Sequence, residues 1–202
     1  MTKAIFIRHG QSTANVGEPT KDFAKVPLTE LGWEQARALA ARWDFTPSLI
    51  AASPFLRTQQ TAQPTIARFP EVPVETWPVY EFTFWDPAYW SGSEPKDMMH
   101  EVDRYWLEAD TELRFGDGAE SFAMLMERAA DTFRRLEALK VDAPVMVFTH
   151  GHFIQALRLT VLHPEWKARR KMQEFRAFDD ARWVTNTELV PAEFDGTRWK
   201  MD

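Results

Sequence analysis

The chain has 202 residues, of which 45% are hydrophobic and 13% aromatic, enough for one well-buried domain and too few for two. We therefore expect residues 1–202 to form a single domain. The formal net charge is -6, and acidic and basic residues are interspersed along the chain. The sequence therefore does not predict the basic surface that binding to nucleic acid or to an anionic membrane requires. Any phosphate site must therefore be a local cluster of basic side chains.

The sequence contains no cysteine, which excludes disulfides, thiolate nucleophiles and metal ions ligated by cysteine. No stretch approaches the roughly 18 apolar residues of a membrane span. The apolar run within residues 3–7 is also too short for a secretory signal. We expect a soluble protein located in the cytoplasm, a reducing compartment with which this composition is compatible.

The first part of the chain alternates short apolar runs with helical patterns. Residues 3–8 and 48–52 are predicted to be buried strands. Between them, apolar residues recur at helical spacing behind Thr29, which predicts a helix with Thr29 as its N-cap. After the second strand, Ser53 as N-cap and a proline at the first helical position predict a helix that runs to about Phe69.

The same alternation continues further along the chain. An extended segment is expected near 72–80 and a long helix over 120–139. Residues 144–149 are the clearest buried strand, and a helix is expected over 153–162. Residues 183–199 alternate more loosely and predict one or two edge strands, which can run antiparallel to the others. This order predicts an α/β fold, a three-layer αβα sandwich around a mostly parallel sheet.

Residues 82–116 break the alternation, because they are rich in Trp, Pro, Met and charged residues. We interpret this segment as an insertion with one short helix over 96–109, which faces the substrate as a lid. Large apolar side chains of this kind are more often core than ligand contacts. Those of the insertion include Trp85, Trp90, Met98, Met99 and Trp106.

Basic residues follow the ends of the predicted strands. Ligands bind beyond the carboxyl ends of strands in an open parallel sheet, so residues placed there converge. Arg8 and His9 follow the first strand, Arg57 lies shortly after the second, and His150 ends the strand at 144–149. Two arginines and two histidines at one crevice of an acidic protein predict an anion site with a nucleophile, and phosphate is the obvious anion.

Several short motifs follow one another in a fixed order. They are Arg-His-Gly within Phe6–Asn15, Leu-Thr-x-x-Gly-x-x-Gln-Ala at Leu28–Ala36, the arginine helix Ser53–Ala62, the acid Glu81, a Gly-Glu-Ser-like turn with one inserted residue at Gly118–Ser121, and the histidine strand end Val147–Gly151. Together they resemble the histidine phosphatase superfamily, in the branch that contains the cofactor-dependent phosphoglycerate mutases. The resemblance spans roughly residues 3 to 160, and such an ordered set is far more specific than a lone Arg-His-Gly.

The resemblance implies a phosphatase in which His9 attacks phosphorus and carries the phosphoryl group as a covalent phosphohistidine. A neutral imidazole is a good nucleophile near pH 7, and it departs well once it is protonated. Arg8, Arg57 and His150 would neutralise the phosphoryl oxygens, the last as a cation in the field of the phosphate dianion. No cofactor and no metal ion are expected, and the partner is a small phosphate ester.

The resemblance also implies further site residues. Asn15 and the backbone of Gly151 would complete the phosphate pocket. Glu81 would protonate the leaving oxygen and then take a proton from the attacking water, although Glu75 is a nearby alternative carboxylate. The aromatic run after Glu81, through Trp85 and Trp90, predicts a leaving group with an apolar or ring-shaped body.

Two positions depart from the family pattern. His152 stands where many relatives carry a glycine, and Gln155 stands where many carry an arginine, so one anion contact is missing. His150 and His152 together also suggest a metal site as an alternative hypothesis, but no cysteine and no acidic-x-His pattern supplies the remaining ligands.

Two other functions compete with the phosphatase. A phosphoglycerate-type mutase would return the phosphoryl group to a second hydroxyl, but the insertion lacks the basic, tyrosine-rich segment of such mutases. A non-catalytic phosphate-binding module would have lost His9, Arg57, Glu81 or His150, and all four are present.

Overall fold

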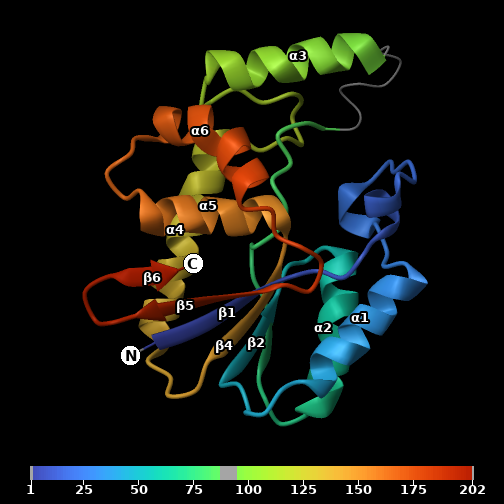
Figure 1. Ribbon diagram of the computed structural model, residues 1–202, viewed down its shortest axis with the longest axis vertical. Coiled ribbons are helices and arrows are strands. Elements are labelled where there is room, and N and C mark those ends of the chain that lie inside the picture. The colour runs from blue at the N-terminus through green and yellow to red at the C-terminus, as the bar shows by residue number, and fades with distance from the viewer. Residues whose placement is uncertain (1, 87–94, 202) are drawn as a thin grey trace.

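The computed structural model describes residues 2–86 and 95–201. Within them, a sheet with the strand order β3-β2-β4-β1-β5-β6 lies between two layers of helices (Figure 1). The strands are β1 (Thr2–Arg8), β2 (Leu49–Ala52), β3 (Val74–Thr76), β4 (Val145–Thr149), β5 (Leu189–Phe194) and β6 (Trp199–Met201).

The sheet is parallel in its first four strands. β1 pairs with β4, and β2 pairs with both β4 and β3, all in parallel. β5 and β6 extend the sheet antiparallel beyond β1. The predicted mostly parallel sheet and its antiparallel edge strands are therefore confirmed, whereas the extended segment at 72–80 pairs only over Val74–Thr76.

The described residues form six helices, and side-chain capping fixes the start of two of them. Thr29 Oγ1 accepts a hydrogen bond from Gly32 N at 3.1 Å, and Ser121 Oγ accepts one from Met124 N at 3.3 Å. These contacts satisfy amides of the first turns of two helices. The helices are α1 (Glu30–Ala41), α2 (Leu56–Arg68), α3 (Pro95–Glu108), α4 (Phe122–Leu139), α5 (Gly151–Leu162) and α6 (Ala168–Ala181), with short 3-10 helices η1 (Thr13–Val16) and η2 (Phe23–Lys25).

The prediction of Ser53 as N-cap of α2 was wrong. The N-cap is Phe55, in extended backbone and without a side-chain hydrogen bond to the helix. Ser53 Oγ instead accepts from Phe55 N at 3.2 Å and lies 2.9 Å from His150 Nε2. That hydroxyl lies three residues before the first residue of α2, and its contacts are to Phe55 and His150.

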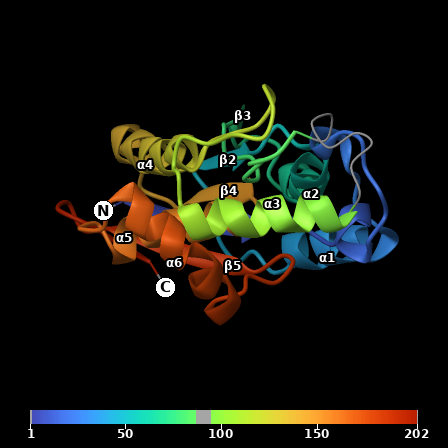
Figure 2. The same ribbon diagram turned by 90° about the horizontal axis from the view of Figure 1, so that it is seen from above.

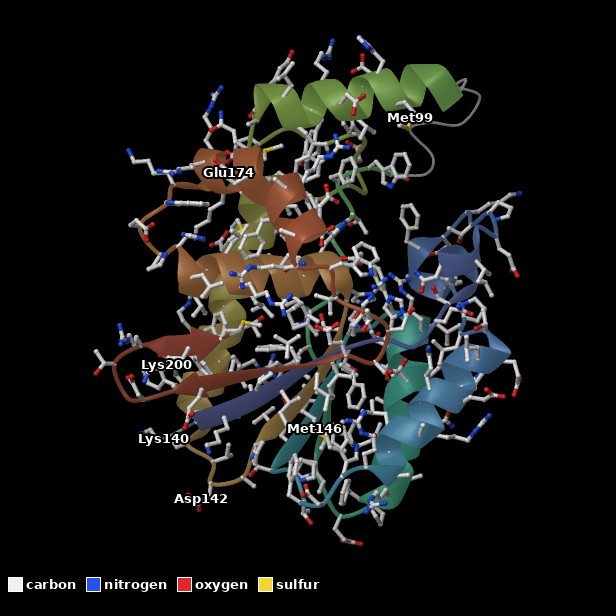
Figure 3. All side chains as sticks on the ribbon, in the orientation of Figure 1. Met99, Lys140, Asp142, Met146, Glu174 and Lys200 are labelled. Atoms are coloured by element: carbon white, nitrogen blue, oxygen red, sulfur yellow. The ribbon has the colours of Figure 1, made fainter. Side chains whose placement is uncertain are left out.

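Alternating side chains of the strands supply two separate cores. One face of the sheet packs against α4 and α5, and the other packs against α1 and α2, so that the sheet lies between them in the view from above (Figure 2). Met146 on β4, labelled in Figure 3, belongs to the second core. The buried members of that core are Ile7, Leu39, Trp43, Ile50, Ala52, Ala62, Met146 and Phe148.

The segment 82–116 contributes α3, which confirms its predicted helix, and α3 packs on α6 (Figure 1). Trp106 of α3 stacks on Phe175 of α6 at 5.6 Å, so this tryptophan is a packing residue. Met99, labelled in Figure 3, is exposed, and Trp90 and the side chain of Met98 lie outside the described residues. In the described part of the chain, no helix is both long enough and apolar enough to cross a membrane.

Candidate active site

Four basic side chains meet at the carboxyl ends of three neighbouring parallel strands. Arg8 ends β1 and His9 follows it, Arg57 lies in the first turn of α2 after β2, and His150 follows β4. All four are at least nine-tenths buried, and the rings of His9 and His150 are 5.2 Å apart. The structure thus brings together the side chains that strand order alone had suggested.

His9 has a defined tautomer. Its Nδ1 lies 2.7 Å from Gly10 O, and Arg57 Nε donates to its Nε2 at 3.1 Å. Because a carbonyl only accepts and a guanidinium only donates, the proton of the neutral ring is on Nδ1 and the lone pair is on Nε2. Burial, followed by the nearby charge of Arg57, holds the pKa of His9 well below its ordinary value. The imidazole is therefore neutral at pH 7.

The two guanidinium groups are held by backbone carbonyls. Arg57 Nη1 donates to Phe23 O at 2.7 Å, and burial lowers the pKa of Arg57 to about 10, so it stays charged at neutral pH. Arg8 Nη1 donates to Val184 O, and the guanidinium lies over the ring of Trp183. Its Nε is buried without a partner, which leaves one donor for an anion.

His150 is arranged differently from His9. Its Nε2 lies 2.9 Å from Ser53 Oγ, while its buried Nδ1 has no partner. Burial, followed by the charge of Arg57, lowers the pKa of His150 well below its ordinary value, so the ring is neutral in this structure. The cationic form expected from the sequence therefore depends on the charge of a bound dianion.

Gly151 and Asn15 border the same cluster. α5 begins at Gly151, and its N-cap makes no side-chain hydrogen bond to the first turn, so the helix start offers amide donors. Asn15 is exposed on η1, and its Oδ1 accepts from Ser12 N at 3.0 Å. This contact fixes the oxygen side of the amide and leaves the NH₂ group as the donor.

Glu81 lies close enough to the arginines for its charge to act on them. Burial lowers the pKa of both Arg8 and Arg57, and the charge of Glu81 raises it. Glu75 is engaged elsewhere, because its Oε2 accepts from Trp77 Nε1 at 2.7 Å and from Arg135 Nη2 at 2.8 Å. These contacts favour Glu81 over Glu75 as the acid.

A buried ion pair, which sequence reasoning missed, fixes the segment that carries Glu81. Arg128 of α4 donates to both carboxylate oxygens of Glu120, at 2.8 and 2.7 Å. Its Nη1 donates to the carbonyls of Pro78 and Tyr80, at 2.9 and 2.8 Å. An arginine on the apolar face of a predicted helix was the available signal, since such a residue requires buried partners.

The loop before β5 also closes on the site, and it too was missed. Asn186 Nδ2 donates to His9 O at 2.9 Å, and Thr187 N donates to Arg8 O at 3.0 Å. Thr187 adopts a φ of 58°, in the left-handed region, to make this turn. Trp183 of the same loop is largely exposed beside Arg8.

His152 and Gln155 lie beside the phosphate cluster. Gln155 is fully buried, and its amide nitrogen donates to Asp179 Oδ1 at 2.9 Å and to Arg182 O at 2.8 Å, so it serves a hydrogen-bond network inside the protein. His152 Nε2 lies 3.4 Å from Asp179 Oδ2. No group of three or more potential metal ligands occurs among the residues that the structure describes.

A cavity of about 680 Å³ adjoins the cluster. It contacts the site through Phe55, whose ring lies 5.3 Å from that of His150, and through Phe23, which binds Arg57 by its carbonyl. Its wall is aromatic, with charged groups at the rim. The lining includes Phe23, Phe55, Tyr80 and Trp85, together with Lys21, Asp22, Asp86, Arg114 and Asp117.

Comparison with known proteins identifies this arrangement. The family model of the histidine phosphatase superfamily (branch 1) matches residues 4–202. A metal-independent phosphoserine phosphatase of Arabidopsis thaliana is 22% identical over 199 residues, covering 93% of this chain and 81% of that protein. A mannitol-1-phosphatase of Eimeria tenella is 33% identical over 109 residues, covering 47% of this chain and 35% of that protein.

Solved structures agree in fold. A phosphoserine phosphatase of Entamoeba histolytica, crystallised with phosphoserine, has a TM-score of 0.75 at 21% identity and covers 100% of this chain and 95% of that one. A mycobacterial glucosyl-3-phosphoglycerate phosphatase has a TM-score of 0.73 at 23% identity and covers 100% and 97%.

Paired arginines around a neutral imidazole at the end of a parallel sheet are suited to binding a phosphoryl group. The chain belongs to the histidine phosphatase superfamily, branch 1. The predicted three-layer fold and the predicted class, a histidine-type phosphoric monoester hydrolase, are thereby confirmed.

Proposed function

We propose that this protein hydrolyses a small phosphate ester by way of a phosphohistidine on His9. The observation that carries the proposal is the state of that ring. Its Nε2 bears a lone pair, its Nδ1 is anchored on Gly10 O, and Arg57 stands 3.1 Å from the nitrogen that would attack. A nucleophile with a fixed tautomer beside fixed cations is what in-line attack on phosphorus requires.

In the first step, Arg57 Nε transfers its hydrogen bond from His9 Nε2 to a phosphoryl oxygen, which frees the lone pair of Nε2. His9 Nε2 then attacks phosphorus as the bond from phosphorus to the leaving oxygen breaks. The buried donors Arg8 Nε and His150 Nδ1, together with Arg57, face the phosphoryl oxygens and stabilise their charge. Gly151 N and Asn15 Nδ2 add further donors. Glu81 gives its proton to the leaving oxygen, which departs as an alcohol.

In the second step, water attacks the phosphohistidine from the side vacated by the alcohol. Glu81, now a carboxylate, takes a proton from that water, and His9 departs from phosphorus as the new bond from phosphorus to oxygen forms. Inorganic phosphate leaves with His9 restored. The positive charge of Arg8 and Arg57 does the work that Mg²⁺ does in kinases, so the reaction needs no metal ion.

The substrate class follows from the cavity beside the cluster. The named relatives are phosphatases of small phosphate esters, including phosphoserine and mannitol 1-phosphate. The aromatic wall formed by Phe23, Phe55, Tyr80 and Trp85 favours a leaving group with an apolar or ring-shaped body. A cytoplasmic location stays a prediction, which cell fractionation tests.

The phosphohistidine is tested directly by rapid, acid-free quenching of the enzyme with a ³²P-labelled substrate. The label is expected on His9, stable in alkali and labile in acid, and it should disappear together with turnover in His9→Ala. A label on serine, threonine or a carboxylate, or one that survives in His9→Ala, rules out this nucleophile. Activity is also expected to persist in EDTA and to be inhibited by vanadate, which mimics the five-coordinate transition state.

A further inference from the structure

His152 lies between two carboxylates that come from different parts of the chain. Its Nδ1 is 4.0 Å from Oε1 of Glu81, and its Nε2 is 3.4 Å from Oδ2 of Asp179 on α6. The ring packs edge-on against Phe175, with 5.7 Å between the ring centroids. Each nitrogen therefore faces a proton acceptor, while 38% of the side chain stays exposed to solvent.

Asp179 is fixed by the interior of the protein. Its Oδ1 accepts from Gln155 Nε2 at 2.9 Å, and the same amide nitrogen donates to Arg182 O at 2.8 Å. Because Gln155 is fully buried, Asp179 cannot turn away without leaving one N–H of that amide unsatisfied. Its other oxygen, Oδ2, thus faces Nε2 of His152, and a carboxylate there selects the protonated Nε2 and directs Nδ1 toward Glu81.

The charges around His152 favour its protonated form. Burial lowers the pKa of His152, but the charge of Glu81 and the hydrogen bond to Asp179 outweigh it, so the pKa is raised overall. Arg8 is the one cation whose charge opposes this among the groups that act on the ring. A general acid must hold a proton at the moment when the bond from phosphorus to the leaving oxygen breaks, and a protonated imidazole beside its carboxyl group can supply that proton.

We propose that His152, oriented by Asp179, acts through Glu81 as the proton store for the leaving group. The inference rests on the proposed role of Glu81 as the acid. When the phosphate dianion binds, the Nδ1 proton passes to the carboxylate of Glu81, and from there to the leaving oxygen as its bond to phosphorus breaks. The proton that Glu81 later takes from water returns to His152, so each turnover consumes one water and releases no net proton.

The test compares an alkyl phosphate, whose leaving oxygen needs a proton, with p-nitrophenyl phosphate, whose leaving oxygen does not. For His152→Gln, kcat for the alkyl ester is expected to fall by about 10- to 100-fold, at or below the range of a general acid itself, while kcat for the aryl ester changes little. The alkaline limb of the pH profile of kcat for the alkyl ester should move to lower pH. Asp179→Asn should shift that limb in the same direction by less, and His163→Gln, at the other end of α5, is the matched control.

Equal losses for both esters with an unmoved alkaline limb would show that His152 only supports the fold. A rise in KM alone would show that it binds an anionic group of the substrate, and this too overturns the proposal. Glu81→Gln distinguishes a failure of the proposed acid, Glu81, from a failure of the proposed proton store, His152. If that variant does not affect the alkyl ester selectively, the proposed acid is wrong. If it does, while His152→Gln does not, only the proton store fails. In the double variant, His152→Gln should add no further loss.

Discussion

The loop after His9 lies close against α1 because Gly10 and Gly32 have no Cβ atom. A Cβ on Gly32 would stand 2.1 Å from Gln11 O, and one on Gly10 would stand 2.7 Å from Gly32 O. The same carbonyl of Gln11 accepts from Thr29 N at 2.9 Å. The Leu-Thr-x-x-Gly motif thus allows the first turn of α1 to pack directly against the loop after His9.

We expect Gly32→Ala to damage both stability and catalysis. The added methyl group meets backbone, which cannot rotate aside, and overpacking of this kind costs about 1–3 kcal/mol. The shift of Gln11 would also displace the loop that holds His9, so kcat should fall with Tm. Thermal unfolding and steady-state kinetics measure both effects. Ala38→Ser, on the exposed face of the same helix, should leave both near wild type. If Gly32→Ala does so too, the close contact is not needed.

The two buried site histidines predict how stability depends on pH. The pKa of His9 and of His150 is held well below the ordinary 6.5 by burial, so the native protein binds no proton where the unfolded chain does. The contribution of these two histidines to the free energy of unfolding should therefore be fully present above about pH 6.5. It should fall on acidification, by up to about 1.4 kcal/mol per pH unit for each histidine. Urea unfolding between pH 5 and 8 tests this expectation. His9→Asn and His150→Asn should each flatten the slope, and slopes equal to wild type would contradict it.

At the scale of elements, the sequence predicted those with a clear internal period. Strands β1, β2 and β4 are continuous apolar runs because helices cover both of their faces. The charged helix α6 gave no such signal, since only a narrow stripe of it is buried. Ser53 misled for a related reason, because its hydroxyl is engaged by the distant His150 and local pattern cannot reveal that partner.

The part of the candidate site that lies at the ends of the parallel strands could be predicted from the sequence. Parallel neighbours bring their carboxyl ends together, and this placed Arg8, His9, Arg57 and His150 without knowledge of the loops. The loop at 182–188 has no period, and its contacts with the residues after β1 join opposite ends of the sequence. Arg128 was missed because two of its four hydrogen bonds go to backbone carbonyls, which leave no trace in the sequence, and because its place on the apolar face of α4 does not reveal which groups it contacts.

Arg128 joins α4 to the segment of Glu81 through the carbonyls of Pro78 and Tyr80, and its charge is compensated by Glu120. Breaking this buried ion pair should therefore cost far more than breaking a surface pair. Glu120→Gln leaves a buried guanidinium uncompensated, which costs about 3–5 kcal/mol. The matched control is Asp131→Asn, which removes an exposed partner of Arg134 on the same helix and should cost less than about 1 kcal/mol. Chemical denaturation measures both. Equal costs would show that the buried pair has no special role.

At the scale of the whole molecule, the cavity beside the phosphate cluster is assembled from segments that are distant in sequence. Phe23 belongs to η2, Phe55 precedes α2, and Tyr80 and Trp85 follow β3. Trp85 stacks on Phe23 at 6.2 Å, which joins two of these segments over the cavity. The proposed function therefore places substrate choice in a part of the molecule that is separate from the phosphate cluster at the strand ends.

We expect Trp85→Ala to change substrate preference. Contacts with the body of the leaving group act only when that body is present, so kcat/KM should fall strongly for the preferred substrate and weakly for a small unspecific ester. The ratio of the two losses is the quantity to measure. Trp43→Phe, in the core on the opposite face of the sheet, is the control and should lower both values alike. Equal losses for Trp85→Ala would mean that this tryptophan serves packing alone.

The central place of β1 has a consequence for how the protein folds. Ala4 pairs with Val145 and Thr2 pairs with Phe194, so both neighbours of this strand lie far along the chain. Closing such long loops costs entropy before any contact compensates for it, and folds with many distant pairings fold slowly. β1, which precedes His9, can therefore pair with its neighbours only after almost the whole chain is available. We expect that a partly folded form without β4 and β5 has no working phosphate pocket.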